Sequence, residues 1–324
     1  MKFRLALLVL AVLPAACVHQ TVASGTKPAP SVWDRQIRNA KDAGDGDYQL
    51  NALRAKVAAE SDNIPARLEL AKTYRERGYP DVALEICRLA AARFPESGEV
   101  QLALAGALRD SNRRNEAISG LEAFLQAHPQ AGPEYQSWLG ILHDEGRQWA
   151  EGEPAWRKAL EQRPQADYLH NNLGYNLLMQ KRYDESAGEF REALKLNAQS
   201  QVARNNLGLA LAWQNSASEA IATWQSGSDP ATAHNNLAAV LMEKGNYPAA
   251  RKELEIALGY NRTFQPAIQN LELVSRLDGQ PVLFPVKRDQ TFWDRFKRLW
   301  VGPLDDSGKD AVRTASVPAT GETK

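Results

Sequence analysis

The sequence predicts an all-α fold built as a solenoid of stacked helix–turn–helix units. Ala and Leu are abundant while Val, Ile and Thr are sparse, and this composition favours helices over sheets. A self-similar period near 34 residues is typical of stacked helical hairpins. Small residues recur in the chain at spacings of 34, 35, 34, 34 and 30, at Ala71, Ala105, Gly140, Gly174, Gly208 and Ala238.

Each unit adds two further features in a constant order. Twelve residues after each of these positions stands a second small residue, and four residues further on stands a bulky or apolar one. In the fourth unit the three residues are Gly174, Ser186 and Phe190. Small residues allow two helix backbones to approach, and the bulky side chain fills the space alongside. Because one hairpin cannot bury its apolar face alone, the copies must stack.

This pattern resembles the tetratricopeptide repeat (TPR), with small residues at repeat positions 8, 20 and 27, an apolar or aromatic residue at 24 and Pro near 32. The resemblance covers six copies over residues 64–263 and implies a right-handed superhelix. Residues 33–63 have the phase of a degenerate preceding repeat, and residues 264–278 are expected to form a capping helix. The fifth copy is short after Trp224, which predicts a trimmed second helix.

The first residues have the pattern of an export signal. Lys2 and Arg4 are followed by an apolar run over residues 5–13, which is far too short to span a bilayer, and by small residues that end at Cys17. Residues 1–17 therefore resemble the signal peptide and lipobox of a bacterial lipoprotein, which implies that Cys17 carries lipid. Pro14 departs from the lipobox, where Leu is usual, and ordinary cleavage near residue 23 is the alternative.

The expected location follows from this signal. Val18 stands where enteric lipoproteins that stay in the inner membrane carry Asp, so the resemblance implies the periplasmic face of the outer membrane. Without lipid, the protein would be periplasmic and soluble. Residues 18–32 and 303–324 are polar, rich in Gly, Pro or Ser, and without periodicity, so they are predicted to be a tether and a disordered tail.

Composition and motifs argue against an enzyme. Lys plus Arg and Asp plus Glu both number 39, so no net charge favours nucleic acid. Phosphate-binding loops, nucleophile elbows and zinc-ligand spacings are missing from the sequence, and no cofactor or metal is expected. His170 and His234 occupy the same repeat position two copies apart, too far to share a metal, and Arg204 replaces them in the intervening copy. Cys87 is expected to be a buried small hydrophobe.

The candidate binding site is one stripe of the first helix in copies four to six. If repeat positions 4, 7, 8 and 11 pack inside, then positions 2, 5, 6, 9, 12 and 13 form a second stripe, which lines the concave groove in TPR proteins. Its Asn side chains carry donors and acceptors for an extended peptide backbone, and its apolar side chains would hold peptide side chains. The predicted groove residues are Tyr168, Asn171, Asn172, Tyr175, Met179, Asn205, Asn206, Leu209, Trp213, Asn235, Asn236 and Met242.

One alternative stays open for this stripe. The Asn at position 6 could instead be a repeat-consensus residue that bonds to the neighbouring copy. In copies one to three the same stripe carries mixed charge and is expected to be a solvated face or a secondary contact. Its charged residues are Lys72, Arg75, Glu76, Arg109, Asp110, Asp144 and Glu145.

A second feature lies in residues 279–302, where a Pro-containing extended stretch precedes a basic and aromatic helix. The sequence TFWDRFKRLW at 291–300 has three alternative roles: it caps the end of the solenoid, binds a membrane surface or docks a partner. The side chains that would make membrane or partner contacts are Trp293, Arg295, Phe296, Lys297, Arg298 and Trp300.

These features together predict a membrane-tethered periplasmic adaptor that binds protein partners and is not an enzyme. The lipobox-like start, the six copies and the shortened fifth repeat are similar to the TadD-type lipoproteins of Tad/Flp pilus systems. That resemblance implies a role in assembling a pilus or secretion machine, with an outer-membrane secretin among the partners. The alternatives are a scaffold for cell-wall or protein-processing enzymes and a membrane-surface protein acting through residues 291–300.

Overall fold

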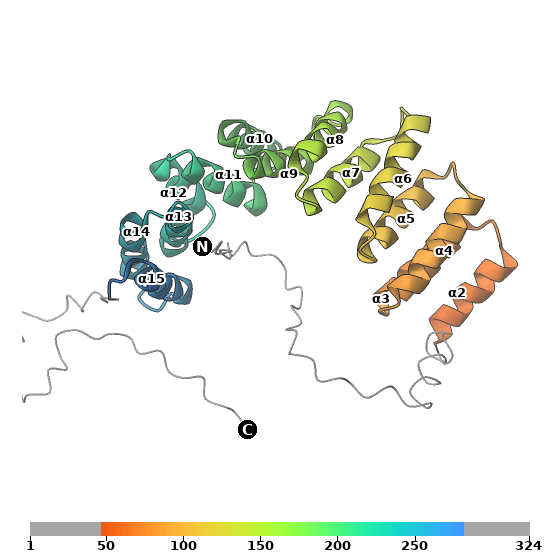
Figure 1. Ribbon diagram of the computed structural model, residues 1–324, viewed down its shortest axis with the longest axis horizontal. Helices are drawn as coiled ribbons and strands as arrows, with labels where there is room; N and C mark the ends of the chain where they lie inside the picture. Colours follow the sequence, from red (N-terminus) through yellow and green to blue (C-terminus); the bar gives the residue numbers. More distant parts are fainter. Residues whose placement is uncertain (1–46, 282–324) are drawn as a thin grey trace, which may run out of the picture. The chain divides into compact units, whose positions relative to one another are not determined.

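The structure, a computed structural model, describes residues 47–281, and every regular element in this range is an α-helix (Figure 1). The described residues belong to two compact units, 47–182 and 183–281. The predicted all-α fold of helical hairpins is confirmed.

Residues 47–182 form a row of helices in which each packs against the next (Figure 1). The first helices of successive hairpins also contact one another, in the order α3, α5 and α7. The helices are α2 (Tyr48–Ala59), α3 (Ile64–Glu76), α4 (Pro80–Arg93), α5 (Gly98–Asp110), α6 (Arg114–Ala127), α7 (Pro133–Glu145), α8 (Trp149–Gln162) and α9 (Asp167–Met179).

Residues 183–281 repeat this arrangement, and here α11, α13 and α15 are the first helices that contact in sequence. The second helix of the fifth copy, α12, has 9 residues against 14 in α14, so the predicted trimming is confirmed. The helices are α10 (Tyr183–Leu196), α11 (Gln201–Trp213), α12 (Ala217–Gln225), α13 (Pro230–Glu243), α14 (Tyr247–Tyr260) and α15 (Gln265–Asp278).

The core of each hairpin is built where a small residue faces a large one. Trp156 on α8 packs on Gly140 of α7, and Trp224 on α12 packs on Gly208 of α11, with both Trp side chains at most 2 % exposed. Burial of one such ring contributes on the order of 2–3 kcal/mol. Cys87 is buried as predicted, and burial raises the pKa of its thiol to about 11.

One predicted core position is wrong. In five of the six copies position 3 packs inside in place of position 4, and its residues Ala66, Val100, Leu169, Ala203 and Ala233 are buried. The third copy is the exception, with Tyr135 half-buried and Gln136 buried. The reason is helical geometry, because position 3 lies close to position 7 on the buried side, while position 4 turns toward the loop before the helix.

The turn inside each hairpin has the same backbone conformation in all six copies. Its residue at repeat position 15 has a positive φ, between 58° and 85°. Only two copies use Gly there, and the others tolerate a left-handed residue at some cost. These residues are Gly78, Asn112, Arg147, Lys181, Asn215 and Gly245.

Several predicted features lie outside the described residues. They are the signal peptide with Cys17, the tether 18–32, the first part of the degenerate repeat 33–63, residues 282–302 with the six predicted contact residues from Trp293 to Trp300, and the tail 303–324. In the described part, no helix combines the length and the hydrophobicity that crossing a membrane requires.

Candidate functional site

The face of α9 presents large apolar side chains to solvent. Tyr168, Tyr175 and Met179 are 45 %, 40 % and 41 % exposed, and their spacing of seven and four residues places them on one side of the helix. Asn171 and Asn172 lie between them, half-buried, and the Asn171 side chain donates to Oδ1 of Asn172 over 3.3 Å. The predicted stripe of copy four is thus an exposed apolar and amide surface.

The Tyr175 ring is positioned by a contact with α8. Its ring packs edge to face against Trp149, with ring centroids 6.1 Å apart. Burial, with the nearby Asp144 carboxyl, raises the pKa of the Tyr175 hydroxyl, so it stays a neutral donor and acceptor near pH 7. An aromatic side chain fixed in one orientation binds a partner with little loss of conformational entropy.

Beneath this face lies a buried polar network that joins α7, α8 and α9. Asp144 accepts hydrogen bonds from Trp156 Nε1 over 2.9 Å and from Asn176 Nδ2 over 2.6 Å. Asn176, fully buried, also donates to the carbonyl of Trp149 over 2.8 Å. Burial raises the pKa of Asp144 to about 6, although both hydrogen bonds act in the opposite direction.

Sequence reasoning missed this network. It placed Asp144 on a solvated charged stripe, whereas the structure buries most of the carboxyl between three helices. The available signal was Asn176 at repeat position 10, where other copies carry Leu142, Ala210 and Val240, all buried. The first copy carries the buried Thr73 there, whose hydroxyl donates to the carbonyl of Glu69. A buried amide, by contrast, needs a specific polar partner from another helix.

The α11 face is less open than its sequence suggests. Asn205, Asn206 and Leu209 are half-buried, as expected of a partly accessible stripe. The Trp213 ring, however, stacks on Tyr183 with centroids 5.6 Å apart, and Lys244 Nζ lies 5.2 Å from the Trp213 ring centroid. Trp213 is therefore already engaged by its own unit.

On α13 two predicted groove residues are wrong. Met242 is 2 % exposed and belongs to the core around α14 and α15, because position 12 lies one turn from the buried small residue at position 8. Asn235 is 9 % exposed and its Oδ1 accepts a 2.9 Å hydrogen bond from Asn270 of α15. Asn236 remains half-buried on the stripe.

The His and Arg of the recurring Asn-Asn motif have a structural role. His170 Nε2 donates to the carbonyl of Pro164 over 3.0 Å, and Arg204 donates to the carbonyl of Ala198 over 2.6 Å. Arg67 and Gln101 make the same bond to a carbonyl six residues earlier. In four of the six copies, repeat position 4 thus ties the first helix to the loop before it, and different donor side chains make this bond.

The histidine of the sixth copy differs. His234 Nδ1 lies 2.7 Å from Glu253 Oε2, and its ring stacks on Tyr260. Within residues 47–281 there is no group of three or more His, Cys, Asp or Glu side chains that could hold a metal ion.

Exchange of His170 for Arg tests this explanation. We expect His170→Arg to change the free energy of unfolding by less than about 0.5 kcal/mol, because Arg can reach the same carbonyl. His170→Ala should cost about 1 kcal/mol, since it removes the donor. Urea denaturation followed by circular dichroism measures both, and equal losses in the two variants would contradict the shared hydrogen bond.

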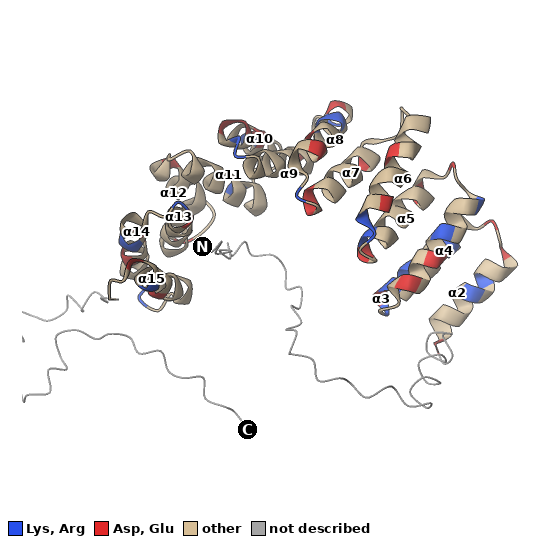
Figure 2. Cartoon of the chain, in the orientation of Figure 1, with Lys and Arg blue, Asp and Glu red and all other residues tan. Residues whose placement is uncertain are grey.

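Helices of residues 47–182 carry charges of both signs (Figure 2). Several side chains of the charged stripe in the first copies form ion pairs with one another. Arg75 Nη1 lies 3.5 Å from Asp110, and Arg109 Nε lies 3.6 Å from Glu145. All four side chains are partly exposed, so these pairs contribute little to stability.

Comparisons with known proteins agree with this architecture. Two family models, both described as tetratricopeptide repeat, match residues 74–140 and 139–201. A tetratricopeptide repeat protein from Parabacteroides merdae is 16 % identical, with a TM-score of 0.50, and the match covers 74 % of this chain and 96 % of that one.

Two further solved structures are similar at lower scores. YrrB, described as a TPR protein with an unusual peptide-binding site, is 20 % identical over 57 % of this chain and 97 % of its own, with a TM-score of 0.45. A MamA protein is 16 % identical over 56 % and 93 %, with a TM-score of 0.45. No curated protein matches the sequence. Residues 74–201 thus match tetratricopeptide repeat models, and the helical hairpins on either side of them have the same helix–turn–helix arrangement.

Proposed function

We propose that this protein is an adaptor without enzymatic activity that binds an extended segment of a partner protein on the exposed face of α9. The observation that carries the proposal is the row of Tyr168, Tyr175 and Met179, each at least 40 % exposed on one side of a single helix. Side chains of this size at regular spacing are typical of surfaces that bind peptides. The half-exposed stripe of Asn205, Asn206 and Leu209 on α11 is a second contact surface of the same kind.

The chemistry of the α9 face suits a peptide backbone. Asn171 and Asn172 offer amide groups that can both donate to and accept from a main chain, whatever its sequence. Met179 is flexible and polarisable and adapts to different apolar side chains. Tyr168 and Tyr175 supply large contact areas with a polar tip. The face therefore favours an extended segment with apolar side chains at intervals.

The export signal and the lipobox-like Cys17 support a location at the periplasmic face of the outer membrane. We propose that lipid on Cys17 tethers the protein there, and that its partners belong to a pilus or secretion machine of the Tad/Flp kind, such as an outer-membrane secretin. Palmitate labelling of the wild type and of Cys17→Ser in cells tests the tether.

The binding face is tested by in vivo photocrosslinking of the full chain. We expect a photoreactive residue at position 175 to capture a defined partner, and the same residue at position 89 to capture none. The variant Tyr168→Ser/Tyr175→Ser/Met179→Ser should weaken association with that partner by about 100-fold or more, because exposed aromatic anchors dominate such interfaces.

The matched control is Tyr48→Ser/Leu89→Ser/Leu196→Ser, which removes three exposed apolar side chains outside the α9 face. These side chains are 89 %, 57 % and 37 % exposed. This control should bind like the wild type. The proposal fails if both triple variants lose the partner equally, or if neither does while both remain folded. Identification of the partner as a cell-wall enzyme would keep the binding face and overturn the pilus role.

A further inference from the structure

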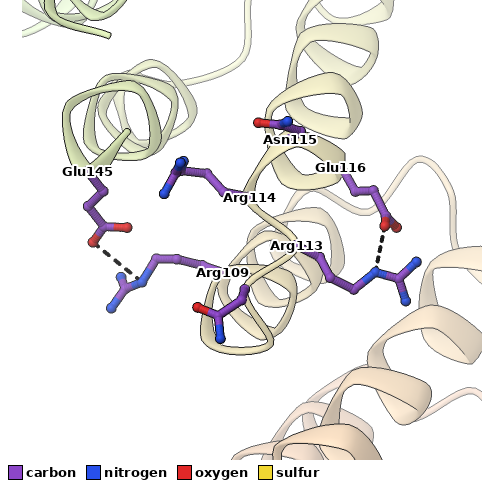
Figure 3. A pocket seen from close by; sticks show the side chains of 7 residues that line it. Arg109, Arg113, Arg114, Asn115, Glu116 and Glu145 are labelled. Atoms are coloured by element: carbon purple, nitrogen blue, oxygen red, sulfur yellow. Dashed lines mark hydrogen bonds and ion pairs between the residues drawn. The ribbon is translucent and has the colours of Figure 1, made fainter. Parts of the chain in front are cut away.

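A cavity of about 440 Å³ lies beside the turn that joins α5 to α6, facing the end of α7 (Figure 3). It shares no residue with the α9 face. Its size falls within the range of pockets that hold small ligands or single peptide side chains. The lining residues are Arg109, Asn112, Arg113, Arg114, Asn115, Glu116 and Glu145.

The charges of this cavity are not balanced. Arg109 pairs with Glu145 over 3.6 Å and also with Asp110 over 3.6 Å, and Arg113 pairs with Glu116 over 2.5 Å. Arg114 forms no ion pair with any described residue, and its Nε atom is buried without a hydrogen-bond partner. Three Arg therefore face two Glu, and one guanidinium remains uncompensated.

A buried donor without a partner is costly. The missing hydrogen bond of a buried guanidinium nitrogen destabilises the folded state, so native proteins rarely leave such an atom unpaired. Gly146 makes room for the group: a Cβ at this residue would lie 3.0 Å from Arg114 Nε. Figure 3 shows the Arg114 and Arg109 side chains extending toward Glu145, on the opposite side of the turn from the Arg113–Glu116 pair.

The repeat itself makes Arg114 an exception. Arg114 stands at repeat position 17, where the third, fourth and sixth copies carry the aromatic residues Trp149, Tyr183 and Tyr247. Those three side chains are only half-exposed, as Arg114 is. The first and fifth copies carry Pro80 and Ala217 there, so Arg114 is the one cation at this position among the six copies.

The start of α6 adds to the positive potential. Arg113 occupies the N-cap position, and no side chain accepts a hydrogen bond from the first turn of this 14-residue helix. The free N–H groups and the helix dipole favour an anion beside them. Asn112 and Asn115, which also line the cavity, can donate from their amides.

We infer that this cavity binds a side-chain carboxylate of an acidic segment in a partner protein. The half-exposed Arg114 side chain can donate to a carboxylate from its terminal Nη atoms, and Arg109 adds a second cation within the same cavity. The charge balance favours a carboxylate over a phosphate, because Glu116 and Glu145 repel a dianion more strongly than a monoanion. The protein thus holds an acidic contact site in residues 109–145, separate from the apolar face of α9.

The inference is tested with the full chain and a fluorescein-labelled tetraglutamate peptide whose termini are acetylated and amidated. Binding is measured by fluorescence anisotropy at low ionic strength. We expect Arg114→Met to weaken binding at least about tenfold, since it removes a charge-assisted pair. Glu145→Gln should tighten binding several-fold, because it frees Arg109 and removes a repelling charge.

The control Arg262→Met makes the same change in net charge at an exposed residue of the other unit, and should leave binding unchanged. A tetraglutamine peptide should not bind. If Arg114→Met proves unfolded by circular dichroism, the Glu145→Gln result decides alone.

Four outcomes would overturn the inference. They are unchanged binding by folded Arg114→Met, an equal loss in Arg262→Met, weaker binding by Glu145→Gln, and displacement of the peptide by an equal concentration of inorganic phosphate. None of these outcomes depends on the α9 face. The acidic contact site and the proposed peptide-binding face are therefore tested independently.

Discussion

Replacement of Gly208 by Ala is expected to lower the free energy of unfolding by about 2–3 kcal/mol, although Ala is intrinsically the better helix former. A Cβ on this residue would lie 2.5 Å from both Cε2 and Nε1 of Trp224. The ring cannot move aside freely, because Trp224 is 2 % exposed and its Nε1 donates to the carbonyl of Asn205 over 3.1 Å. Gly140→Ala should behave alike against Trp156, where the same distance is 2.5 Å.

Two variants separate this clash from an ordinary effect of Gly in a helix. Gly188→Ala, in a helix where nothing lies within 4 Å of the added Cβ, should stabilise by about 0.5–1 kcal/mol. The double variant Gly208→Ala/Trp224→Leu should recover part of the loss, since copies with Ala at position 8 pair it with Cys87, Leu121 or Leu254. Urea unfolding measures these variants together with Trp224→Leu alone. A double variant with the full sum of the losses of Gly208→Ala and Trp224→Leu would argue against the steric explanation.

The second large effect concerns pH. Burial raises the pKa of Asp144 to about 6 in the folded protein, against an ordinary value of 3.8. The folded state therefore holds this proton more tightly than the unfolded chain does. The resulting stabilisation is complete below pH 4 and is lost as the pH rises through about 6. The full shift corresponds to about 3 kcal/mol, and because the side chain is only half-buried, screening by solvent lowers the expected change to about 2 kcal/mol.

Asp144→Asn should abolish this component, so the difference between variant and wild type is expected to vary with pH between 4 and 7. The absolute stability of the variant also reflects the loss of one acceptor for Trp156 or Asn176, and the slope is therefore the informative quantity. A ¹³C NMR titration of the carboxyl checks the midpoint directly. In Asn176→Ala the midpoint should rise further, because a hydrogen bond to the charged form is lost. A midpoint near 4 in the wild type would refute the buried network.

The repeat register could be predicted because the small and bulky residues that set it lie within one hairpin. The sequence predicts a close helix pair wherever a Gly is followed sixteen positions later by a Trp, as at Gly140 and Gly208. The same period located the exposed Tyr168, Tyr175 and Met179 correctly on one face of α9. Helical spacing suffices for these features, since each depends on residues of one helix or one hairpin.

The incorrect predictions concern residues whose exposure depends on helices of a neighbouring repeat. Met242 and Asn235 were predicted on the open stripe, but α15 and α14 bury them. Asp144 was predicted on a solvated face, but Asn176, 32 residues later, brings it into a network. A helical wheel places a side chain on a face and does not reveal which helix of the next copy covers that face.

The sequence by itself thus determined the all-helical repeat, its period near 34 residues, the shortened fifth copy and the paired Gly and Trp positions. The tertiary structure alone decided which of the stripe residues remain exposed, that the half-buried Asp144 joins a hydrogen-bond network, and that Arg114 lies in a cavity with its Nε unpaired. The physical reason is the range of the interactions. Helix formation and hairpin packing act over a few turns of chain, whereas burial and charge compensation depend on side chains a whole repeat away.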